Sequence, residues 1–493
     1  MKKRAIVIGG GHNGLVAACL LKKNDIETTV LEAKNTVGGA CRNSVFSAQS
    51  VNWGANHLFM LAEEVISSLN LYSDLNEMAF KFASKEADYI HIDRVKNCSD
   101  EEKHKLFNEE VTRAAKVFKE EMMKKNSSVE CFRNRIKNLQ LRSEDLFIDG
   151  SLLDVFNFYF GESSEITAEK ISGKILSKYR VDKENTAISI LYLACSNPRF
   201  EPWASSPYGM QSITDCLKEK FNSAGGKIIT NQKIEKALWR NNLVSEVLTE
   251  DGISYVADYF LFSGSPLDFY NIFHKKDRTN FNKNFLKEWS NAEQDGGCSK
   301  MMISSRTPLT FKGAKSDALQ STMLVKGLKL DQWVQQFEYA AKNGHSNEPY
   351  FEVFGPSDFH HKDDDRYIYS IFIMYSSYTK LISMSKSDRE DEKNKLKDYI
   401  ISYIHNPDAV IDVETMDPVD LENEFGLRRG NVDHGRFTLD CILDRRRIDQ
   451  QILDDVDANV VGCGSGFWAG GLVSGLPGLL AVEHLLKKNG VTT

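Results

Sequence analysis

The amino-acid sequence predicts an α/β protein with two domains, one built on a Rossmann-like sheet and the other on a mixed sheet with helices. Three apolar, strand-like segments that lead into glycine turns carry this prediction: residues 5–8, 255–262 and 460–462. Because they lie far apart in the sequence, we expect the Rossmann-like domain to be assembled from discontinuous segments. A chain of 493 residues with 41% apolar residues is large enough for two hydrophobic cores.

The first segment has the order of strand, glycine turn, helix, strand and acid that is typical of a dinucleotide-binding unit. In the turn at residues 9–14, Gly9 permits the tight bend, Gly11 lets the backbone approach a pyrophosphate, and Gly14 lets the helix pack closely on the sheet. Glu32 ends the second strand, where a carboxylate would bind the adenosine ribose. A glycine-rich turn without a nucleotide is the alternative, and the ordered context argues against it.

A second glycine pair follows the acid. Gly38 and Gly39 precede Arg42, whose planar guanidinium suits phosphate or the oxygens near a flavin. The segment resembles the double-glycine segment that follows the first βαβ unit of FAD-dependent amine oxidases and phytoene-desaturase-like enzymes. This resemblance favours FAD over NAD as the cofactor.

The C-terminal segment predicts a contact with the flavin ring. Residues 460–466 are typical of a strand that enters a glycine-rich loop, and residues 470–478 lead into an apolar helix through Leu485. A glycine-lined helix N-terminus offers backbone N–H groups, and hence positive potential, to an anionic reduced flavin. Alternatively, these glycines only let the helix pack against the first sheet.

The middle of the chain predicts a return to the same domain. A helix after residues 206–213 is expected to end at Gly225-Gly226, and two strands follow it. Residues 255–262 resemble the strand by which phytoene-desaturase-like and amine-oxidase chains re-enter the dinucleotide fold. In those families a backbone position near Ile234 would contact the adenine.

Together with residues 418–427 and 430–435, these motifs resemble the phytoene-desaturase-like FAD oxidoreductases, within the amine oxidase and phytoene desaturase superfamily. The match is best to the branch of pyridine-nucleotide-disulfide-oxidoreductase-domain proteins. The resemblance implies a FAD-binding domain of residues 1–75, 205–275 and 430–493, and a substrate-binding domain of residues 76–204 and 276–429 with a helical insertion near 93–142. No Cys or His stands in a motif for covalent flavin attachment, so we expect non-covalent FAD.

The residues expected to contact the cofactor come from the glycine segments, the end of the second strand and the strand near the adenine. They are Gly9, Gly11, His12, Asn13, Gly14, Glu32, Ala33, Gly38, Gly39, Arg42, Ile234, Gly464, Gly471, Leu472 and Val473. Where relatives carry a Pro-Gly-Gly-Gly run, this chain has residues 469–472, Ala-Gly-Gly-Leu, preceded by Phe467 and Trp468. We expect the leucine and the two aromatic side chains to reshape the substrate pocket.

The expected reaction passes a hydride from a substrate to N5 of the flavin. His57 and His434 are the candidate proton acceptors, because both lie in segments that are close to the flavin in the family, and a structural hydrogen-bonding role is the alternative for each. Residues 60–440 contain no second glycine-rich βαβ unit, so the substrate is the expected electron donor. Oxygen, a quinone or another acceptor would take up the electrons.

Two functional classes remain open. The first is a FAD-dependent desaturase or oxidase that acts on a C–C or C–N bond of a small or moderately apolar metabolite, with amine oxidation as the alternative chemistry. The second is a binding protein such as the Rab escort and GDP-dissociation-inhibitor proteins, which resemble this fold. The intact glycines and Glu32 favour the enzyme.

Composition excludes several other classes. The 62 basic and 69 acidic residues leave a net charge of −7, which gives no electrostatic footprint for nucleic acid. Nine cysteines without a C-x-x-C pair predict a reduced, cytoplasmic protein without a dithiol active site. No stretch approaches the roughly 18 consecutive apolar residues of a membrane span.

Three polar regions are expected to be solvated. The insertion at residues 93–142 mixes both charges and predicts exposed helices, one of them with an apolar face at residues 114–118, and peripheral membrane contact is the alternative. His360-His361 with residues 363–365 is expected to be a polar turn and not a metal site. Residues 445–447, three arginines, are expected to form either a solvated cluster or an anion contact.

Overall fold

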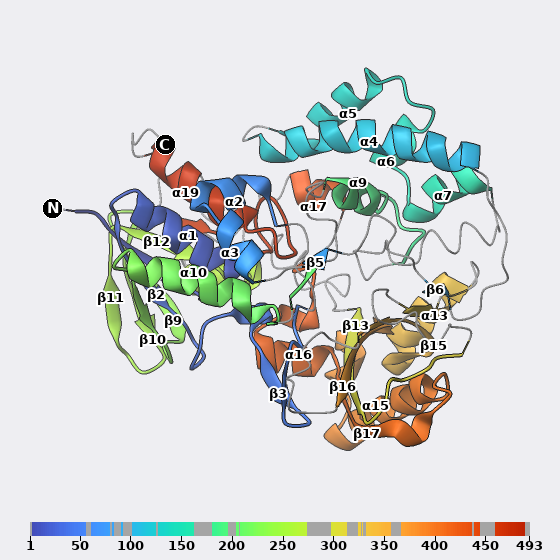
Figure 1. Cartoon of the computed structure of the whole chain (residues 1–493). Coiled ribbons are helices and arrows are strands. Elements are labelled where there is room, and N and C mark those ends of the chain that lie inside the picture. The colour runs from blue at the N-terminus through green and yellow to red at the C-terminus, as the bar shows by residue number, and fades with distance from the viewer. Residues whose placement is uncertain are drawn as a thin grey trace.

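The fold is taken from a computed structural model of the chain. Figure 1 shows a layered α/β part on the left and, on the right, a group of helices above a second sheet. His57, residues 360–365 and residues 445–447 lie outside the described residues, so the hypotheses about them stay predictions. The structure describes residues 2–55, 61–78, 81–82, 90–91, 101–124, 127–161, 180–195, 204–206, 208–273, 297–312, 324–326, 328, 332–355, 366–435, 438–443 and 459–488.

The α/β part is built on a parallel sheet of five strands. Its order is β18-β12-β1-β2-β8, so strands from the two ends and the middle of the chain lie side by side. This order confirms the predicted Rossmann-like sheet of discontinuous segments. The strands are β1 (Arg4–Ile8), β2 (Glu27–Leu31), β8 (Lys227–Ile229), β12 (Tyr259–Phe262) and β18 (Val460–Gly462).

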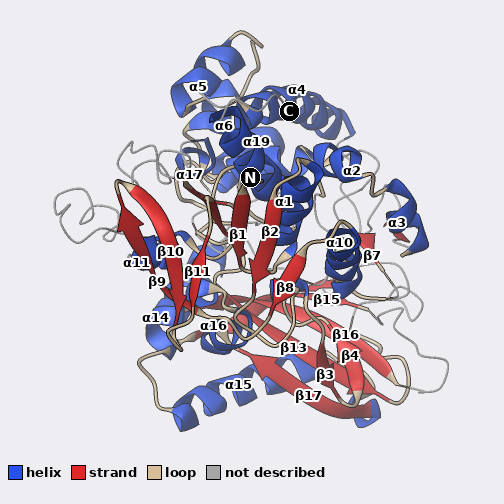
Figure 2. Cartoon of the chain, turned by 90° about the vertical axis from the view of Figure 1, so that its left-hand side faces the viewer, coloured by secondary structure: helices blue, strands red, loops and turns tan. Residues whose placement is uncertain are grey.

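Helices cover one face of this sheet and a small antiparallel sheet covers the other (Figure 2). Along β1, Ala5 and Val7 pack toward the helices, whereas Ile6 and Ile8 pack toward the small sheet and α11. Strands that are buried on both faces are continuously apolar, which is why β1 and β12 were recognisable in the sequence. The helices are α1 (His12–Lys23), α2 (Glu63–Leu69), α3 (Tyr72–Glu77), α10 (Gln211–Ser223) and α19 (Leu476–Lys488), and the opposite layer is β9 (Ile234–Arg240), β10 (Leu243–Thr249), β11 (Ser254–Val256) and α11 (Pro266–Phe273).

The second part contains a mixed six-stranded sheet, as predicted. Its order is β17-β13-β16-β15-β14-β6, and only the β14–β6 pair among these strands is parallel. Helix α15 packs on one face of the sheet through Leu396 and Ile400. The strands are β6 (Ile90–His91), β13 (Cys298–Ser305), β14 (Leu324–Lys326), β15 (His345–Phe354), β16 (Tyr367–Ser376) and β17 (Val410–Met416), and the helices are α13 (Gln332–Asn343), α14 (Tyr378–Leu381), α15 (Lys386–Ile401) and α16 (Pro418–Phe425).

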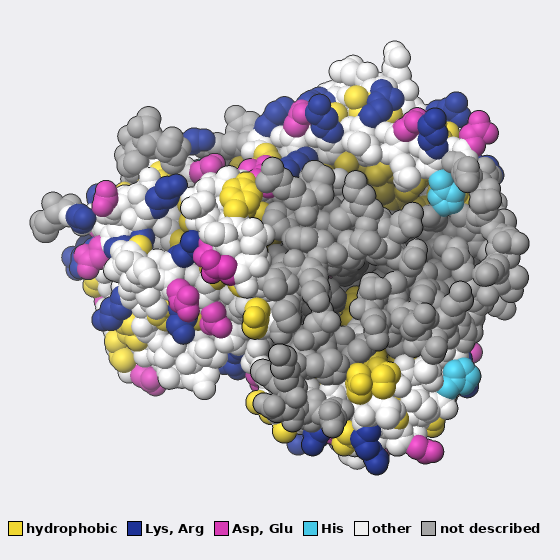
Figure 3. All heavy atoms as spheres, viewed as in Figure 1, with side chains coloured by type: hydrophobic (Ala, Val, Ile, Leu, Met, Phe, Trp, Pro, Cys, Tyr) yellow, Lys and Arg dark blue, Asp and Glu magenta, His cyan; other side chains and the backbone are white. Residues whose placement is uncertain are grey.

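The helical group contains the predicted insertion. Ala114, Ala115 and Phe118 of α4 are buried, which confirms the apolar face, and both signs of charge are interspersed on the exposed side of the upper helices (Figure 3). None of the helices in the described part is long and apolar enough to cross a bilayer. The group comprises α4 (Glu101–Met123), α5 (Val129–Lys137), α6 (Glu144–Ile148), α7 (Leu152–Phe160), α9 (Ile188–Ala194) and α17 (Leu439–Leu443), and two short hairpins elsewhere pair β3 (Ser44–Phe46) with β4 (Gln49–Val51) and β5 (Lys81–Phe82) with β7 (Ala204–Ser205).

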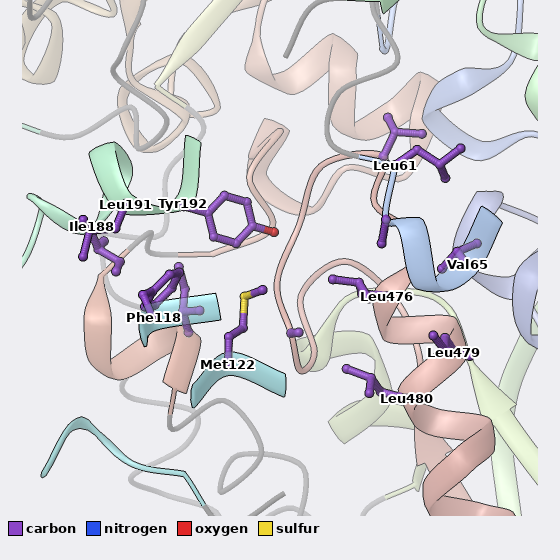
Figure 4. Packing of buried hydrophobic residues seen from close by; sticks show 14 of the residues in the cluster. Leu61, Val65, Phe118, Met122, Ile188, Leu191, Tyr192, Leu476, Leu479 and Leu480 are labelled. Carbon is purple, nitrogen blue, oxygen red and sulfur yellow. The ribbon is translucent and has the colours of Figure 1, made fainter. Parts of the chain in front are cut away.

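One hydrophobic cluster joins the helical group to the parallel sheet. The C-terminal loop is the segment of residues 463–475 between β18 and α19. Figure 4 shows Phe118 and Tyr192 on one side of this loop and Leu476 and Leu479 of α19 on the other, and all four belong to the cluster. Helix α19 also packs directly on α1. The boundaries between the two predicted domains stay a prediction.

Gly478→Ala should destabilise the fold through the contact of α19 with α1. A Cβ at Gly478 would overlap the carbonyl oxygen of Asn13, and backbone cannot move as freely as a side chain end. We expect the free energy of unfolding in urea to fall by about 1–3 kcal/mol. Gly252→Ala is the control, because Gly252 has a φ of +80° and nothing within 4 Å of its Cβ position, so it measures backbone strain alone. A loss at Gly478 no larger than the loss at Gly252 would contradict this account.

Candidate dinucleotide-binding site

The first glycine turn leaves the N-terminus of α1 open. Gly9 bends the chain with a φ of +99° and donates its N–H to the carbonyl of Leu31 at 2.8 Å. A Cβ at Gly14 would overlap the carbonyl oxygen of Gly9, so the helix can start this close to β1 only with glycine there. No side chain caps α1, and its first turn carries no acidic residue. The N–H groups and the positive end of the helix dipole are therefore available to an anion.

The second glycine pair lies directly beside the first turn. Gly38 donates its N–H to the carbonyl of Gly10 at 2.9 Å, and a Cβ at Gly39 would lie 3.1 Å from the Cα of Gly11. Gly38 and Gly39 both have positive φ angles, +133° and +54°, which favour glycine. A Cβ at Gly11 would meet only the Cα of Gly39, at 3.9 Å, so this side of the turn faces open space.

Glu32 lies where the motif places it, at the end of β2, and is 8% exposed. Its Oε2 accepts the N–H of Gly10 at 2.7 Å, and its Oε1 accepts the N–H of Lys34 at 2.9 Å. The carboxylate thus fixes the glycine turn, and each oxygen can accept further hydrogen bonds. Ala33, the next residue, is exposed.

Ile234 is brought close to Glu32 by the chain just before β9. Gln232 donates its N–H to the carbonyl of Glu32 at 2.8 Å, and Asn231 donates to the carbonyl of Lys34 at 2.9 Å. Ile234 itself is buried at the start of β9. These bonds hold Ile234, the predicted adenine contact, close to Glu32, the predicted ribose contact.

Arg42 binds other parts of the protein in this structure. Its guanidinium bonds to the side chain of Glu424 and, at 3.1 Å, to the carbonyl of the same residue, and it lies 5.6 Å from the ring centre of Phe425. Lys34 likewise bonds to the carbonyl of Asn423 at 3.2 Å. Both cations thus bind the negative C-terminal end of α16. Arg42 joins the glycine segment to α16, and a direct contact with phosphate or flavin stays a prediction.

The C-terminal loop lies beside the first glycine turn, although it comes from the other end of the chain. A Cβ at Gly464 would overlap the carbonyl oxygen of Gly264, so the packing role of that glycine is real. A Cβ at Gly471 would lie 3.2 Å from the carbonyl oxygen of Asp433. Leu472 has a φ of +65°, and Val473 is buried in the main hydrophobic cluster. The loop is therefore packed closely against the backbone at Gly264 and Asp433.

The side chains of His12 and Asn13 point from the first turn to this loop. Asn13 donates from Nδ2 to the Oγ of Ser465 at 2.9 Å. His12 lines a small apolar cavity together with Val473 of the loop. Burial lowers the pKa of His12 to about 4. The sequence predicted these two residues as cofactor contacts, and their side chains also join the two glycine segments.

His434 lies next to the C-terminal loop. It has a φ of +56°, donates its N–H to the carbonyl of Asn431 at 3.2 Å, and its own carbonyl oxygen would lie 3.1 Å from a Cβ at Gly466. This position agrees with the segment being near the predicted flavin. Its role in proton transfer stays a prediction.

Lys300 and Tyr192 were not predicted, and Trp468 was expected only to reshape the substrate pocket. Lys300 of β13 is 3% exposed and donates from Nζ to the carbonyl of Gly54. Tyr192 of α9 donates to the carbonyl of Gly471 at 3.3 Å, and Trp468 donates to the carbonyl of Met122 at 2.8 Å. The sequence feature that could have identified Lys300 is that it is the single charged residue in β13.

The hypothesis that Phe467 shapes a substrate pocket is wrong. Its ring is fully buried against Phe269, in the hydrophobic cluster on the face of the parallel sheet opposite the helices. Apolar packing in that cluster holds the ring there.

Among the described residues, no group of three or more His, Cys, Asp or Glu side chains is placed to hold a metal ion.

Sequence comparison supports this site. The model of the NAD(P)-binding Rossmann-like domain family matches residues 7–70, which contain both glycine segments of the N-terminal part and Glu32. Pyridine nucleotide-disulfide oxidoreductase domain-containing protein 2 of Rattus norvegicus is 21% identical over 565 residues, which cover 98% of this chain and 93% of that protein. The chain therefore contains a Rossmann-like domain and is similar over nearly its whole length to this protein. The predicted resemblance and the oxidoreductase class are confirmed.

Solved structures share the whole fold. Wild-type putrescine oxidase bound to putrescine matches with a TM-score of 0.60 and 14% identity, over 99% of both chains. An oxidoreductase from Methanosarcina mazei matches with a TM-score of 0.59 and 12% identity, over 98% of this chain and all of the other. Both matches extend over the α/β part and the second part, so the predicted fold class is confirmed for the full chain.

His12→Gln should flatten the pH dependence of unfolding between pH 6.5 and 4. The folded protein keeps His12 neutral down to about pH 4, whereas the unfolded chain takes up the proton near 6.5. Stability is therefore fully present above pH 6.5 and falls as the pH is lowered through this window, by up to roughly 3 kcal/mol. Urea unfolding of both proteins at pH 7, 5.5 and 4.5 measures the difference, and parallel pH profiles would contradict the shift. His345 is present in both proteins, so its own titration cancels.

Proposed function

We propose that the chain is a FAD-dependent oxidoreductase that holds FAD non-covalently and oxidises a C–C or C–N bond of a small or moderately apolar metabolite. The observation that carries the proposal is the open space at Gly11. It lies at the uncapped N-terminus of α1, between two glycine segments and beside the strand that ends in Glu32. A backbone cradle of this kind supplies N–H groups and positive potential to a pyrophosphate.

The residues present fit FAD. Gly11 faces open space that could hold the diphosphate, and Gly38 and Gly39 place the second glycine segment beside it. Glu32 has acceptor capacity left for a ribose hydroxyl, and the loop at residues 471–473 is the candidate contact of the flavin ring. When bound, FAD would supply a hydride acceptor at N5. The remaining chemistry of the site depends on the chain's own groups.

Those groups hold the surroundings of the C-terminal loop rigid. Tyr192 donates to the carbonyl of Gly471, Asn13 donates to Ser465, and Lys300 donates to the carbonyl of Gly54. In this proposal the substrate lies against the loop, where fixed hydrogen bonds and buried aromatic side chains orient it and exclude water. His434 and His57 are the candidate proton acceptors of the reaction.

Amines are the second candidate substrate class, because the chain shares its fold with putrescine oxidase bound to putrescine. A binding protein of the GDP-dissociation-inhibitor kind would not need the open cradle at Gly11.

We further propose that the reaction takes place in the cytoplasm and that oxygen, a quinone or another acceptor removes the electrons.

Glu32→Ala should weaken FAD binding by about 1.5–3 kcal/mol, the range for a hydrogen bond to a charged group. The variant removes the acceptor for the ribose and also the acceptor that fixes the Gly10 N–H. Titration of the apoproteins with FAD measures the loss, and urea unfolding checks that the fold persists. Glu32→Gln is the control, since it keeps one acceptor oxygen and should lose less. An unchanged FAD affinity in Glu32→Ala would refute the ribose role.

The proposed function is tested by cofactor content and by the direction of electron flow. The purified protein should be yellow, with about one FAD per chain released intact by acid, and NADPH should bleach it slowly or not at all under anaerobic conditions. Gly11→Val is the matched control: its backbone φ of −72° and open surroundings let the fold persist, while the side chain fills the diphosphate space. A colourless wild-type protein that cannot be reconstituted would overturn the proposal. Rapid reduction by NADPH would make it a reductase.

A further inference from the structure

Tyr192 connects the helical group to the C-terminal loop. It lies in α9 and is 1% exposed, and its hydroxyl donates to the carbonyl oxygen of Gly471 at 3.3 Å. Its ring packs edge-on against Phe118 of α4, with the ring centres 6.4 Å apart. Figure 4 shows the hydroxyl directed toward the loop. Aromatic packing and one hydrogen bond thus orient this side chain at the candidate contact of the flavin ring.

Trp468 provides a second bond between the same two parts. Its indole N–H donates to the carbonyl oxygen of Met122 at 2.8 Å. Met122 lies in the last turn of α4, where the carbonyl groups have no partner within the helix. The indole N–H, which can only donate, satisfies this carbonyl. Residues 468–471 are therefore bound to the helical group at both of their ends.

The bond from Tyr192 fixes the orientation of the peptide unit between Gly471 and Leu472. This peptide bond is trans, and in a planar trans peptide the C=O and the N–H point in opposite directions. Because the carbonyl of Gly471 points to Tyr192, the N–H of Leu472 points away from it. A side chain 279 residues before Gly471 thus determines the direction of this donor.

The N–H of Leu472 is available to a ligand. Within the described part of the chain neither this group nor the N–H of Val473 has a hydrogen-bond acceptor. Val473 is buried, and a buried N–H without an acceptor costs free energy. An acceptor atom on a bound group would remove that cost. Asn13 bonds to Ser465 of the same loop, so these donors lie close to the first glycine turn.

We propose that Tyr192 is a positioning residue of the cofactor site, which binds the Gly471 carbonyl and thereby directs the Leu472 N–H toward the flavin. This inference rests on the proposed function, since it assumes FAD at residues 471–473. Tyr192 acts through the backbone and not by contact with the reacting atoms. A backbone N–H stabilises an anion more than a neutral group, so a correctly directed N–H favours the anionic reduced flavin over the oxidised flavin.

Tyr192→Phe tests this role, because it removes the hydroxyl and keeps the ring that packs on Phe118. We expect the affinity for reduced flavin to fall by about three- to tenfold relative to the affinity for oxidised flavin. This is part of the strength of one hydrogen bond to a charged group, since the N–H is misaligned and not removed. The measured result would be a lower midpoint potential of the bound FAD, with a shift of its visible absorption bands.

Two further variants complete the experiment. Tyr159→Phe is the matched control, because Tyr159 is a buried tyrosine of the same helical group whose hydroxyl donates to Glu110 at 2.6 Å. It should lower the free energy of unfolding and leave the midpoint potential unchanged. Trp468→Phe removes the other bond of the segment and keeps an aromatic ring. It should lower the potential in the same direction as Tyr192→Phe.

Each outcome decides between the alternatives. An unchanged potential and spectrum in a folded, FAD-bound Tyr192→Phe would make Tyr192 merely structural and overturn the positioning role, while the proposed function stands. An equal fall of the potential in Tyr159→Phe would also overturn it, because any loosening of the helical group would then have the same effect. If Tyr192→Phe does not fold, an unchanged potential in Trp468→Phe would overturn it instead. Failure of the wild-type protein to bind FAD would overturn the proposed function and remove the positioning role with it.

Discussion

The backbone around the first turn of α1 is packed so closely that segments from both ends and the middle of the chain meet without room for a side chain. A Cβ at Gly14 would overlap Gly9, one at Gly478 would overlap Asn13, and one at Gly464 would overlap Gly264. These contacts fix α1, α19 and the turn at Gly264, which follows β12, against one another. The position of every other group near the site follows from this arrangement.

The close packing also explains the electrostatics of the site. Because no side chain caps the start of α1 and Gly11 faces open space, the N–H groups there stay accessible, and the helix dipole adds positive potential. Glu32 binds the turn from the opposite side through Gly10. An anion at Gly11 would accept hydrogen bonds from backbone donors that no described side chain caps. In physical terms the fold is prepared for a diphosphate.

The sequence predicted the parts of this arrangement that local patterns determine. Strands β1 and β12 are continuously apolar because both of their faces are buried, and the positions of Gly9, Gly14 and Glu32 follow from the geometry of one βαβ unit. The buried face of α4 was predicted from a local pattern too. The mixed sheet was expected with the substrate domain that the family resemblance implies.

Contacts between distant segments could not be predicted in the same way. The partners of Asn13 and Arg42 lie 452 and 382 residues away, and nothing local indicates that their side chains bind a loop or a helix end. Lys300 is recognisable as important only after β13 is known to be buried, and the side of the sheet that Phe467 occupies depends on the tight turn before it. Long-range tertiary packing decides these positions.

The central claim is that one dinucleotide site is shared by the two ends of the chain. A crystal structure of the wild-type protein soaked with FAD tests it most directly. We predict the diphosphate at Gly11 and the N-terminus of α1, the adenosine ribose on Glu32, and the flavin ring against residues 471–473. Density for the diphosphate away from α1, or a flavin ring that makes no contact with the C-terminal loop, would contradict the account.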